Sequence, residues 1–357
     1  MHPISVCIIA KNEEKRIEKC LSSIKPYGFE IVVVDTGSTD RTKEIAGKYA
    51  DKVLDFTWCD DFSAARNFSL REASNNWIFM LDCDEYIKSI DVDELNYFRK
   101  HLSGSVGSVS RENLVTENGV LTLNNIDYTE RFYDKRLYRY SGMIHEQLTP
   151  AHGREMPVYL LKTTILHTGY DMSESDRIAK YHRNYTLLLK QLEQEPDNPY
   201  LYYQLGKTSE IVKDYAKACD YYDKGLSFDL DPELAYVQAM VVSYGNALLL
   251  SDQAAAALGF EGIYDEFSVS ADFVYLMGNI YKQNAMYEQA MGEYQKAMGM
   301  PLCRQNGANS YLPLFQTGEI CRLLGDMDTA CACYSRCGDY APARDRLLTI
   351  QNGGDKH

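Results

Sequence analysis

The most constraining feature of the sequence is the stretch Trp77–Ile87 (WIFMLDCDEYI), in which an apolar run leads directly into three carboxylates. A short continuous apolar run predicts a strand that is buried on both faces of a parallel sheet. Asp82 and Asp84 then lie where such a strand ends, which is where open α/β sheets bind ligands. Alternate residues of an extended segment face the same side, so both carboxylates can meet one Mg²⁺ or Mn²⁺ ion. The alternative is a strand end followed by a solvated acidic turn.

Size and composition limit the classes of protein to be considered. A chain of 357 residues is too long for one ordinary core, so two domains are expected. The apolar fraction of 45% and the charged fraction of 25% are typical of a soluble globular protein. The formal net charge of −14 argues against a nucleic-acid partner, because phosphate contacts need Lys and Arg. A small anionic ligand stays possible if a divalent cation accompanies it.

Targeting signals and cysteine usage favour a cytoplasmic location. The first apolar run is interrupted by Lys11, Asn12 and Glu13, so we expect no signal peptide. An integral membrane segment is not expected either, because no apolar stretch approaches the roughly 20 residues that a membrane span needs. The ten cysteines are scattered and are predicted to be free thiols in a reducing compartment.

In the N-terminal half, strand and helix signals alternate. Apolar runs predict strands at Ile4–Ala10, Glu30–Val34 and Val53–Phe56. Apolar residues at helical spacing predict a helix over Ile17–Ile24, and another is expected over Thr42–Tyr49. Two strands around a helix form a right-handed βαβ unit. We therefore predict a Rossmann-like α/β domain with a mostly parallel sheet.

A second polar stretch, Asp35–Thr42 (DTGSTDRT), follows the second predicted strand. Gly37 permits a tight turn, and Ser38, Thr39 or Asp40 can cap the next helix. An acid at a strand end can accept hydrogen bonds from a base or ribose, as in dinucleotide sites. The alternative is an ordinary strand–turn–helix connection with a good cap.

Four segments in this order carry a resemblance to a known family: ISVCIIAKNEE, IVVVDTGSTDRT, DDFSAARN and WIFMLDCDEYI. They resemble the family 2 glycosyltransferases of the GT-A fold, over roughly residues 3–170. The resemblance implies a nucleotide-sugar donor, usually linked to UDP, a divalent metal ion, and inversion at the anomeric carbon.

The resemblance also implies site residues. Asp35 is expected to reach the uracil, and Arg66 and Asn67 match a basic patch near the donor. The metal ligands are expected to be Asp82, Asp84 and His167, with Asp84 favoured as the direct ligand. The complete set expected to bind the nucleotide sugar is Ala10, Asn12, Glu13, Asp35, Ser38, Arg66, Asn67 and Asp82.

The metal prediction includes a histidine that follows the last expected strand, Val158–Leu166. His167 matches a position at which GT-A enzymes often complete the metal shell, although a histidine at a strand end is commonly structural. Two carboxylates with one imidazole fit Mn²⁺ better than Mg²⁺.

The middle of the chain is expected to supply the acceptor side. Arg131–Tyr140 (RFYDKRLYRY) is basic and aromatic, and either holds an anionic group or forms an edge strand protected by charge. The following SGMIHE resembles the family's acceptor-side segment and presents Glu146. An inverting transfer needs a general base, for which Glu146 is the first candidate and Glu85 the second. A structural role is the alternative for either glutamate.

From Ser173 onwards the strand signal disappears and a repeating helical pattern takes over. In each of three sets a Gly is followed by an Ala after 12 residues and by a Tyr after another 4. The pattern resembles the tetratricopeptide repeat, with a degenerate repeat around Ala235–Phe267. The three sets are Gly206, Ala218 and Tyr222; Gly278, Ala290 and Tyr294; and Gly318, Ala330 and Tyr334.

We therefore predict an α/β GT-A domain over residues 1–170, a connecting helix and linker over 171–198, tetratricopeptide-like repeats over 199–350 and a disordered tail over 351–357. This combination resembles bacterial glycosyltransferases that modify peptides or proteins, such as the bacteriocin S-glycosyltransferases. The resemblance implies a cytoplasmic, metal-dependent inverting transferase that moves a sugar from a UDP-sugar to Ser, Thr or Cys of a polypeptide. The repeats are expected to recruit this acceptor or to form a homodimer.

Two alternatives remain open from the sequence. The same domain can act on a cell-envelope saccharide or a lipid-linked acceptor. A different class is a tetratricopeptide adaptor whose transferase domain is inactive.

Overall fold

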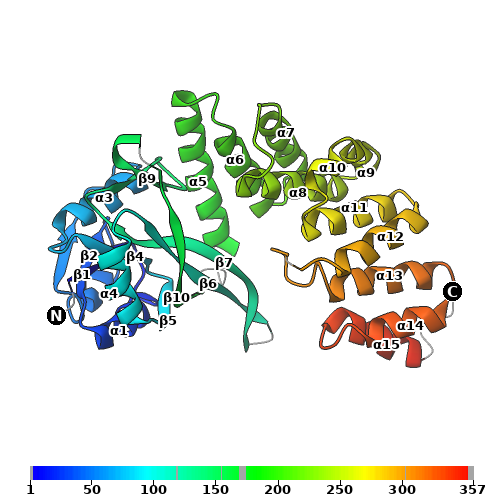
Figure 1. The fold of residues 1–357 in the computed structure, drawn as a ribbon, viewed down its shortest axis with the longest axis horizontal. Helices are drawn as coiled ribbons and strands as arrows, with labels where there is room; N and C mark the ends of the chain where they lie inside the picture. The colour runs from blue at the N-terminus through cyan, green and yellow to red at the C-terminus, as the bar shows by residue number, and fades with distance from the viewer. Residues whose placement is uncertain (1–2, 118–119, 154, 169–173, 302, 353–357) are drawn as a thin grey trace. The chain divides into compact units, whose positions relative to one another are not determined.

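A computed structural model describes residues 3–117, 120–153, 155–168, 174–301 and 303–352 (Figure 1). The chain divides into two compact units, Met1–Gln191 and Leu192–His357. This division falls within the predicted connecting segment, whose helix is α5 (Glu174–Gln194). Most of the predicted tail lies outside the described residues.

The first unit is built on a mixed sheet, for which the described residues give the strand order β3-β2-β1-β4-β7-β6-β10-β5 (Figure 1). The four strands β3, β2, β1 and β4 pair in parallel, as predicted, whereas β7 is antiparallel to both of its neighbours. A separate ribbon pairs β8 with β9. The strands are β1 (Ile4–Ala10), β2 (Glu30–Asp35), β3 (Lys52–Asp55), β4 (Trp77–Asp82), β5 (Glu85–Ser89), β6 (Val106–Glu117), β7 (Val120–Asp134), β8 (Tyr138–Ser141), β9 (Gln147–Pro150) and β10 (Val158–His167).

Helices cover both faces of this sheet. Alternate residues of β1 point to opposite faces, so Ile8 packs in one apolar cluster with α1 and α4, and Cys7 packs in another with α3. Both faces of β1, β2 and β4 are therefore buried, which explains their continuous apolar runs. The helices and helical turns are α1 (Ile17–Ile24), η1 (Lys25–Tyr27), α2 (Thr42–Ala46), α3 (Phe62–Glu72), α4 (Val92–His101) and η2 (Ala151–Gly153).

Two expectations from the sequence need correction. The helix predicted over Thr42–Tyr49 ends at Ala46, because Gly47, a poor helix former, follows it. The alternative that the basic stretch Arg131–Tyr140 forms an edge strand is wrong for its first part. Residues 131–134 belong to β7, which lies between β4 and β6 with Phe132 paired on both sides.

The second unit contains helices that pack in consecutive pairs (Figure 1). The pairs α6/α7, α11/α12 and α13/α14 coincide with the three sequence sets, and α8 begins the degenerate repeat. Along the described part of the chain, no helix has both the length and the hydropathy to cross a membrane. The elements are α6 (Pro199–Ile211), α7 (Tyr215–Leu226), α8 (Ala235–Leu250), α9 (Ala254–Ala257), η3 (Leu258–Ile263), α10 (Tyr264–Phe267), α11 (Ala271–Gln283), α12 (Tyr287–Met298), α13 (Tyr311–Leu323), α14 (Met327–Ser335) and α15 (Ala341–Gln351).

The Gly-to-Tyr spacing has a direct structural cause. In each of the three pairs the Gly of the first helix lies against the Tyr ring of the second helix. A methyl group built at Gly318 would come within 2.6 Å of Tyr334 Cε1, and that tyrosine is buried. The small residue therefore allows the two helices to approach closely, as the sequence pattern indicates.

This packing predicts that Gly318→Ala destabilises the protein. The added methyl group would overlap the Tyr334 ring, and overpacking of this kind costs about 1–3 kcal/mol. The measurement is thermal or urea unfolding. Gly292→Ala in α12 is the matched control, because a methyl group there meets nothing within 4 Å. The control should leave stability unchanged or raise it by up to about 1 kcal/mol, and equal losses in both variants would contradict the packing argument.

Candidate active site

The loops that follow β1 and β2 interlock at the carboxyl edge of the sheet. The Asn12 N–H donates to Ser38 Oγ at 2.9 Å, and Asn12 Oδ1 accepts from the Thr39 N–H at 2.8 Å. The Ala10 carbonyl accepts from the Thr36 N–H at 2.9 Å, which joins the two strand ends. The residues predicted for the nucleoside pocket on these two loops therefore lie together.

Asp35 is the buried acid of this edge, with 1% of its surface exposed. Its Oδ1 accepts from the backbone N–H groups of Gly37 and Ser38, at 3.0 and 2.8 Å. Its Oδ2 is buried and has no hydrogen-bond partner among the residues that the structure describes. A buried polar atom without a partner is costly, so this oxygen is suited to accept a hydrogen bond from a ligand N–H.

Glu13 links the nucleoside loops to the acidic turn after β4. Its backbone N–H donates to Thr42 Oγ1 at 2.7 Å, and its carboxylate accepts from Arg16 at 3.1 Å. Burial raises the pKa of Glu13, Arg16 opposes this change, and the negative charge of Asp84 adds to it. The carboxylate therefore lies within electrostatic reach of Asp84.

Arg66 connects two other predicted site residues that are distant in sequence. Its Nη2 donates to Asp82 Oδ1 at 2.7 Å, and its Nε donates to the carboxylate of Glu146. The guanidinium also lies 5.3 Å from the centre of the Tyr140 ring. Burial alone would raise the pKa of Asp82, but Arg66 and Arg131 outweigh it and hold this pKa well below its usual range. Asp82 is therefore an ionised carboxylate near neutral pH.

Arg131 is a site residue that the sequence did not single out. Its Nη2 donates to Asp82 Oδ2 at 3.1 Å and to Glu85 Oε1 at 2.6 Å. Glu85 is fully buried, and its Oε2 accepts from the Asp82 N–H at 3.1 Å. These bonds favour an organising role for Glu85, the second candidate for the base. Asp82, in turn, has one oxygen bonded to each of two arginines.

The side-chain amide of Asn67 hydrogen-bonds to main-chain atoms of Tyr140. Its Nδ2 donates to the Tyr140 carbonyl at 2.8 Å, and its Oδ1 accepts from the Tyr140 N–H at 2.9 Å. These two bonds hold β8 against α3. They favour a structural role for Asn67 over the expected contact with the donor.

Asp84 and His167 meet at the same edge of the sheet. Asp84 lies in the turn between β4 and β5, and His167 ends β10, which pairs with β5. The Thr168 N–H donates to the Asp84 carbonyl at 3.1 Å, which ties this turn to the end of β10. His167 Nε2 lies 3.4 Å from Asp84 Oδ2. The two residues predicted as metal ligands are therefore adjacent.

A hydrogen-bond relay sets the orientation of the His167 ring. Asn113 is fully buried and donates through Nδ2 to Asp127 Oδ2 at 3.1 Å, which leaves its Oδ1 to accept from His167 Nδ1 at 2.8 Å. Arg111 fixes Asp127 with two bonds of 2.8 Å. In the neutral ring the proton is thus assigned to Nδ1, and the Nε2 lone pair faces Asp84.

This arrangement fits a divalent cation. An imidazole lone pair and a carboxylate oxygen at 3.4 Å repel each other unless a proton or a cation lies between them. Histidines that bind metal ions commonly donate their other ring N–H to an oxygen, as His167 does to Asn113. Within the described residues no group of three or more His, Cys, Asp or Glu side chains is arranged to hold an ion. Asp84 and His167 would therefore supply two ligands, and Asp82 as a third stays a prediction.

Helix α5 packs on the loop that carries Glu146. The Gln191 Oε1 accepts from the Met143 N–H at 3.0 Å, and Arg183 lies 5.4 Å from the centre of the Phe62 ring. His145 in this loop has φ +50°, and burial together with Lys180 and Arg183 lowers its pKa to about 4. Lys180 and Arg183 of α5 therefore place positive charge beside this loop.

The residues that sequence reasoning missed share one pattern. Arg111 and Asn113 are alternate residues of β6, and both bond to Asp127 on the neighbouring strand β7. Arg131 lies four residues after Asp127 on the same strand. Polar residues at alternate positions of two adjacent strands were the available signal.

Removing Arg131 is predicted to destabilise the first unit strongly. In Arg131→Met the fully buried Glu85 carboxylate would lose its closer arginine and keep the longer contact of 3.4 Å with Arg111. Removing one partner of a buried ion pair costs about 3–5 kcal/mol. The double variant Glu85→Gln/Arg131→Met should recover much of this loss. Arg41→Met is the control, because its pair with Glu44 is exposed and contributes little to stability. Urea unfolding measures all three, and a loss no larger for Arg131 than for Arg41 would refute the prediction.

Two families match this chain. Residues 5–149 match the family model for Glycosyl transferase family 2, and residues 199–232 and 271–301 match the model for Tetratricopeptide repeat. No repeat match covers the segment between them, which includes α8 and the broken helix after it.

Individual relatives cover parts of the chain. The SPbeta prophage-derived glycosyltransferase SunS of Bacillus subtilis is 29% identical over 238 residues, which are 63% of this chain and 54% of SunS. A TPR repeat-containing protein of Synechococcus elongatus is 45% identical over 85 residues, which are 24% of this chain and 21% of that protein. The crystal structure of S. aureus TarS 1–349 in complex with UDP-GlcNAc matches with a TM-score of 0.39 and 17% identity, over 83% of this chain and 92% of that one.

The chain spans about half the length of the two SunS proteins that it matches, at 54% of each. The sheet order, the polar edge and the repeated helix pairs agree with the two family matches. The chain carries a family 2 glycosyltransferase domain followed by tetratricopeptide repeats.

Proposed function

We propose that this protein is a metal-dependent inverting glycosyltransferase that transfers a sugar from a UDP-sugar to Ser, Thr or Cys of a peptide or protein. The reaction class is supported by the family match and by relatives named as glycosyltransferases. The observation that carries the proposal is the approach of Asp84 Oδ2 to His167 Nε2 at 3.4 Å, with Asn113 orienting the ring.

Asp84 and His167 would hold a Mn²⁺ or Mg²⁺ ion, and the imidazole favours Mn²⁺. When bound, such an ion neutralises charge on the diphosphate of the donor and stabilises the leaving nucleotide. Asn113 would keep the His167 proton on Nδ1, so that Nε2 stays available as a ligand atom. Asp82, held by Arg66 and Arg131, would lie beside the donor as a fixed negative charge.

The nucleoside is proposed to lie on the interlocked loops of β1 and β2. Asp35 Oδ2 would accept the imide N–H of uracil, which would satisfy this buried oxygen. Asn12 and Ser38 hold each other through the 2.9 Å bond and would shape the pocket, together with Ala10 and Glu13. Guanine also carries a ring N–H that Asp35 Oδ2 could accept. The preference for uracil over guanine therefore has to be measured directly.

Glu146 is proposed as the general base. It would take the proton from the acceptor hydroxyl or thiol as the oxygen or sulfur atom attacks the anomeric carbon. The bond from that carbon to the diphosphate oxygen breaks at the same time, and its electron pair leaves with UDP. The contact with Arg66 holds the Glu146 carboxylate in place, and the side chain is about 10% exposed, so a bound acceptor can reach it.

The proposed acceptor class is supported by the helical repeats, and the proposed location is supported by the cysteines. Tetratricopeptide stacks present extended binding surfaces, which suits recruitment of a polypeptide or contact with a second copy of the chain. The cysteines, all of them within the described residues, are free thiols, which supports a reducing, cytoplasmic location.

Donor binding is predicted to require both UDP and a divalent cation. A thermal-shift panel of UDP-, GDP- and dTDP-sugars, each with Mn²⁺ or with EDTA, should show stabilisation only for a UDP-sugar with Mn²⁺. A ligand at 100 times its dissociation constant stabilises the folded state by about 2.7 kcal/mol, and EDTA should remove this gain. A folded protein that responds to no nucleotide would instead support an adaptor with an inactive transferase domain.

Variants make this test specific. Asp84→Asn and His167→Ala should abolish the stabilisation by metal and donor. Asn113→Ala should weaken Mn²⁺ binding, measured by calorimetry at saturating UDP, by about 10–100-fold, because the ring would lose its orienting bond. Asp93→Asn, an exposed acid in the first turn of α4, should behave as wild type.

Glu146→Gln is predicted to lower turnover while donor binding persists. The loss should be about 10²–10⁴-fold, the usual contribution of a general base. The readout is UDP release in the presence of synthetic peptides that contain Ser, Thr or Cys, beside the thermal shift with UDP-sugar and Mn²⁺. If donor binding disappears together with turnover, Glu146 acts on the donor site through Arg66 and is not the base.

A further inference from the structure

The degenerate repeat differs from the other three in its second helix. The spacing of 12 residues is kept between Gly245 and Ala257, but Glu261 takes the place of the buried tyrosine. The segment after α8 is broken into α9, η3 and α10, whereas α7, α12 and α14 are continuous helices. Gly245 consequently lies against Leu276 of α11 and not against a tyrosine ring.

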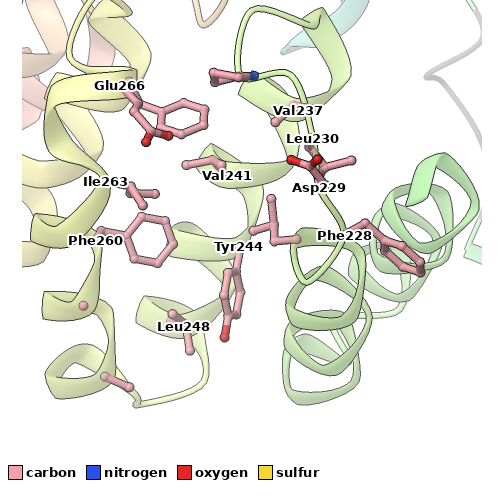
Figure 2. Close-up of a pocket in the computed structure, with 15 residues that line it drawn as sticks. Phe228, Asp229, Leu230, Val237, Val241, Tyr244, Leu248, Phe260, Ile263 and Glu266 are labelled. Carbon is pink, nitrogen blue, oxygen red and sulfur yellow. The ribbon is translucent and has the colours of Figure 1, made fainter. Parts of the chain in front are cut away.

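A pocket of about 490 Å³ opens beside this broken helix (Figure 2). Phe260 and Ile263 of η3 line one side, Leu230 of the α7–α8 connection lines the other, and Val241 of α8 lies between them. We call this space the α8 pocket. Its volume lies in the range of ligand sites and accommodates a large apolar side chain with part of its backbone.

The charge around the α8 pocket is negative. Asp229 and Glu266 are exposed and line it, and the fifteen lining residues, all of them described, include no Lys, Arg or His. Asp231 and Asp265 are exposed neighbours of these two acids in the sequence. Lys224 lies nearby, with its Nζ 5.5 Å from the centre of the Phe228 ring, but it is not among the lining residues.

The apolar lining of the α8 pocket (the floor) and its two exposed acids, Asp229 and Glu266 (the rim), restrict which ligands can bind there. Phosphorylated or nucleotide ligands are disfavoured, because the two carboxylates would repel them. A neutral apolar molecule would use the floor but would gain nothing from the acids. A segment with one large apolar side chain between basic residues complements both features.

We propose that the α8 pocket binds a polypeptide segment in which an aromatic or branched aliphatic side chain is flanked by Lys or Arg. The inference rests on the proposed function in one respect, namely that the segment belongs to the acceptor. Binding of the segment itself requires neither donor nor metal ion. The pocket is formed by α8 and the broken helix after it, so it depends on the degenerate repeat and not on the three regular helix pairs.

The test is fluorescence anisotropy with the full-length protein in EDTA. The probe is a short fluorescein-labelled peptide of Gly and Ser with one central Phe between Lys residues. We expect saturable binding with a dissociation constant below about 1 mM. Two matched peptides, with Phe replaced by Ser or with every Lys replaced by Glu, should bind about tenfold or more weakly.

Two variants address the pocket itself. Gly259→Phe should fill the pocket, because Gly259 lines it and a Cβ there meets nothing within 4 Å. Glu266→Lys reverses the charge of one exposed lining acid. Both should weaken the Phe–Lys peptide about tenfold or more. The controls are Gly292→Phe and Glu288→Lys in α12, which make the same changes at exposed positions outside the lining.

Several outcomes would overturn the inference. These are no binding of the peptide up to about 1 mM, equal binding of the Glu-containing peptide, or undiminished binding by Gly259→Phe. A change in oligomeric state on Gly259→Phe would assign the pocket to a second copy of the chain instead. Donor binding, measured separately by thermal shift, distinguishes failure of this inference from failure of the proposed function.

Discussion

The structure of the candidate active site depends on two buried guanidinium groups. Arg66 and Arg131 each bond one oxygen of Asp82, and they extend the contact to Glu146 and Glu85. Buried charges are tolerated only when they are paired, so these two guanidinium groups and three carboxylates fix one another. The turn that follows Asp82 carries Asp84, and it is therefore placed by the same network. The position of Asp84 beside His167 is a consequence of this charge balance.

The sequence predicts the parts of this site that depend on local patterns. Strands buried on both faces need continuous apolar runs, so β1, β2 and β4 can be recognised from composition alone. Their carboxyl ends meet in a parallel sheet, and the register aligns Ala10 with Asp35 and Ile9 with Asp82. The spacing of Gly and Tyr likewise predicts close helix pairs. The degenerate repeat was located by elimination, within the bounds of α8 to α10.

The remaining parts could not be predicted, because they depend on pairing between distant segments. Arg131 and Asp82 are 49 residues apart, and His167 and Asn113 are 54 residues apart. The basic stretch that begins at Arg131 has the same composition whether its charges face water or buried carboxylates, and this is why the edge-strand alternative failed. The α8 pocket also left no pattern of its own, because it arises where a helix is interrupted.

The pairing of Asp84 with His167 has a consequence for how the proposed site takes up a metal ion. On the proposed function Asp84 and His167 would give an ion two protein ligands, whereas Mg²⁺ and Mn²⁺ commonly take six. On the proposed function the other positions belong to water and to the phosphates of the donor. Cation and nucleotide sugar then raise each other's affinity by the same factor, because such coupling is reciprocal. The protein would thus hold little metal between turnovers, and the pool of nucleotide sugar would control how much cation the enzyme retains.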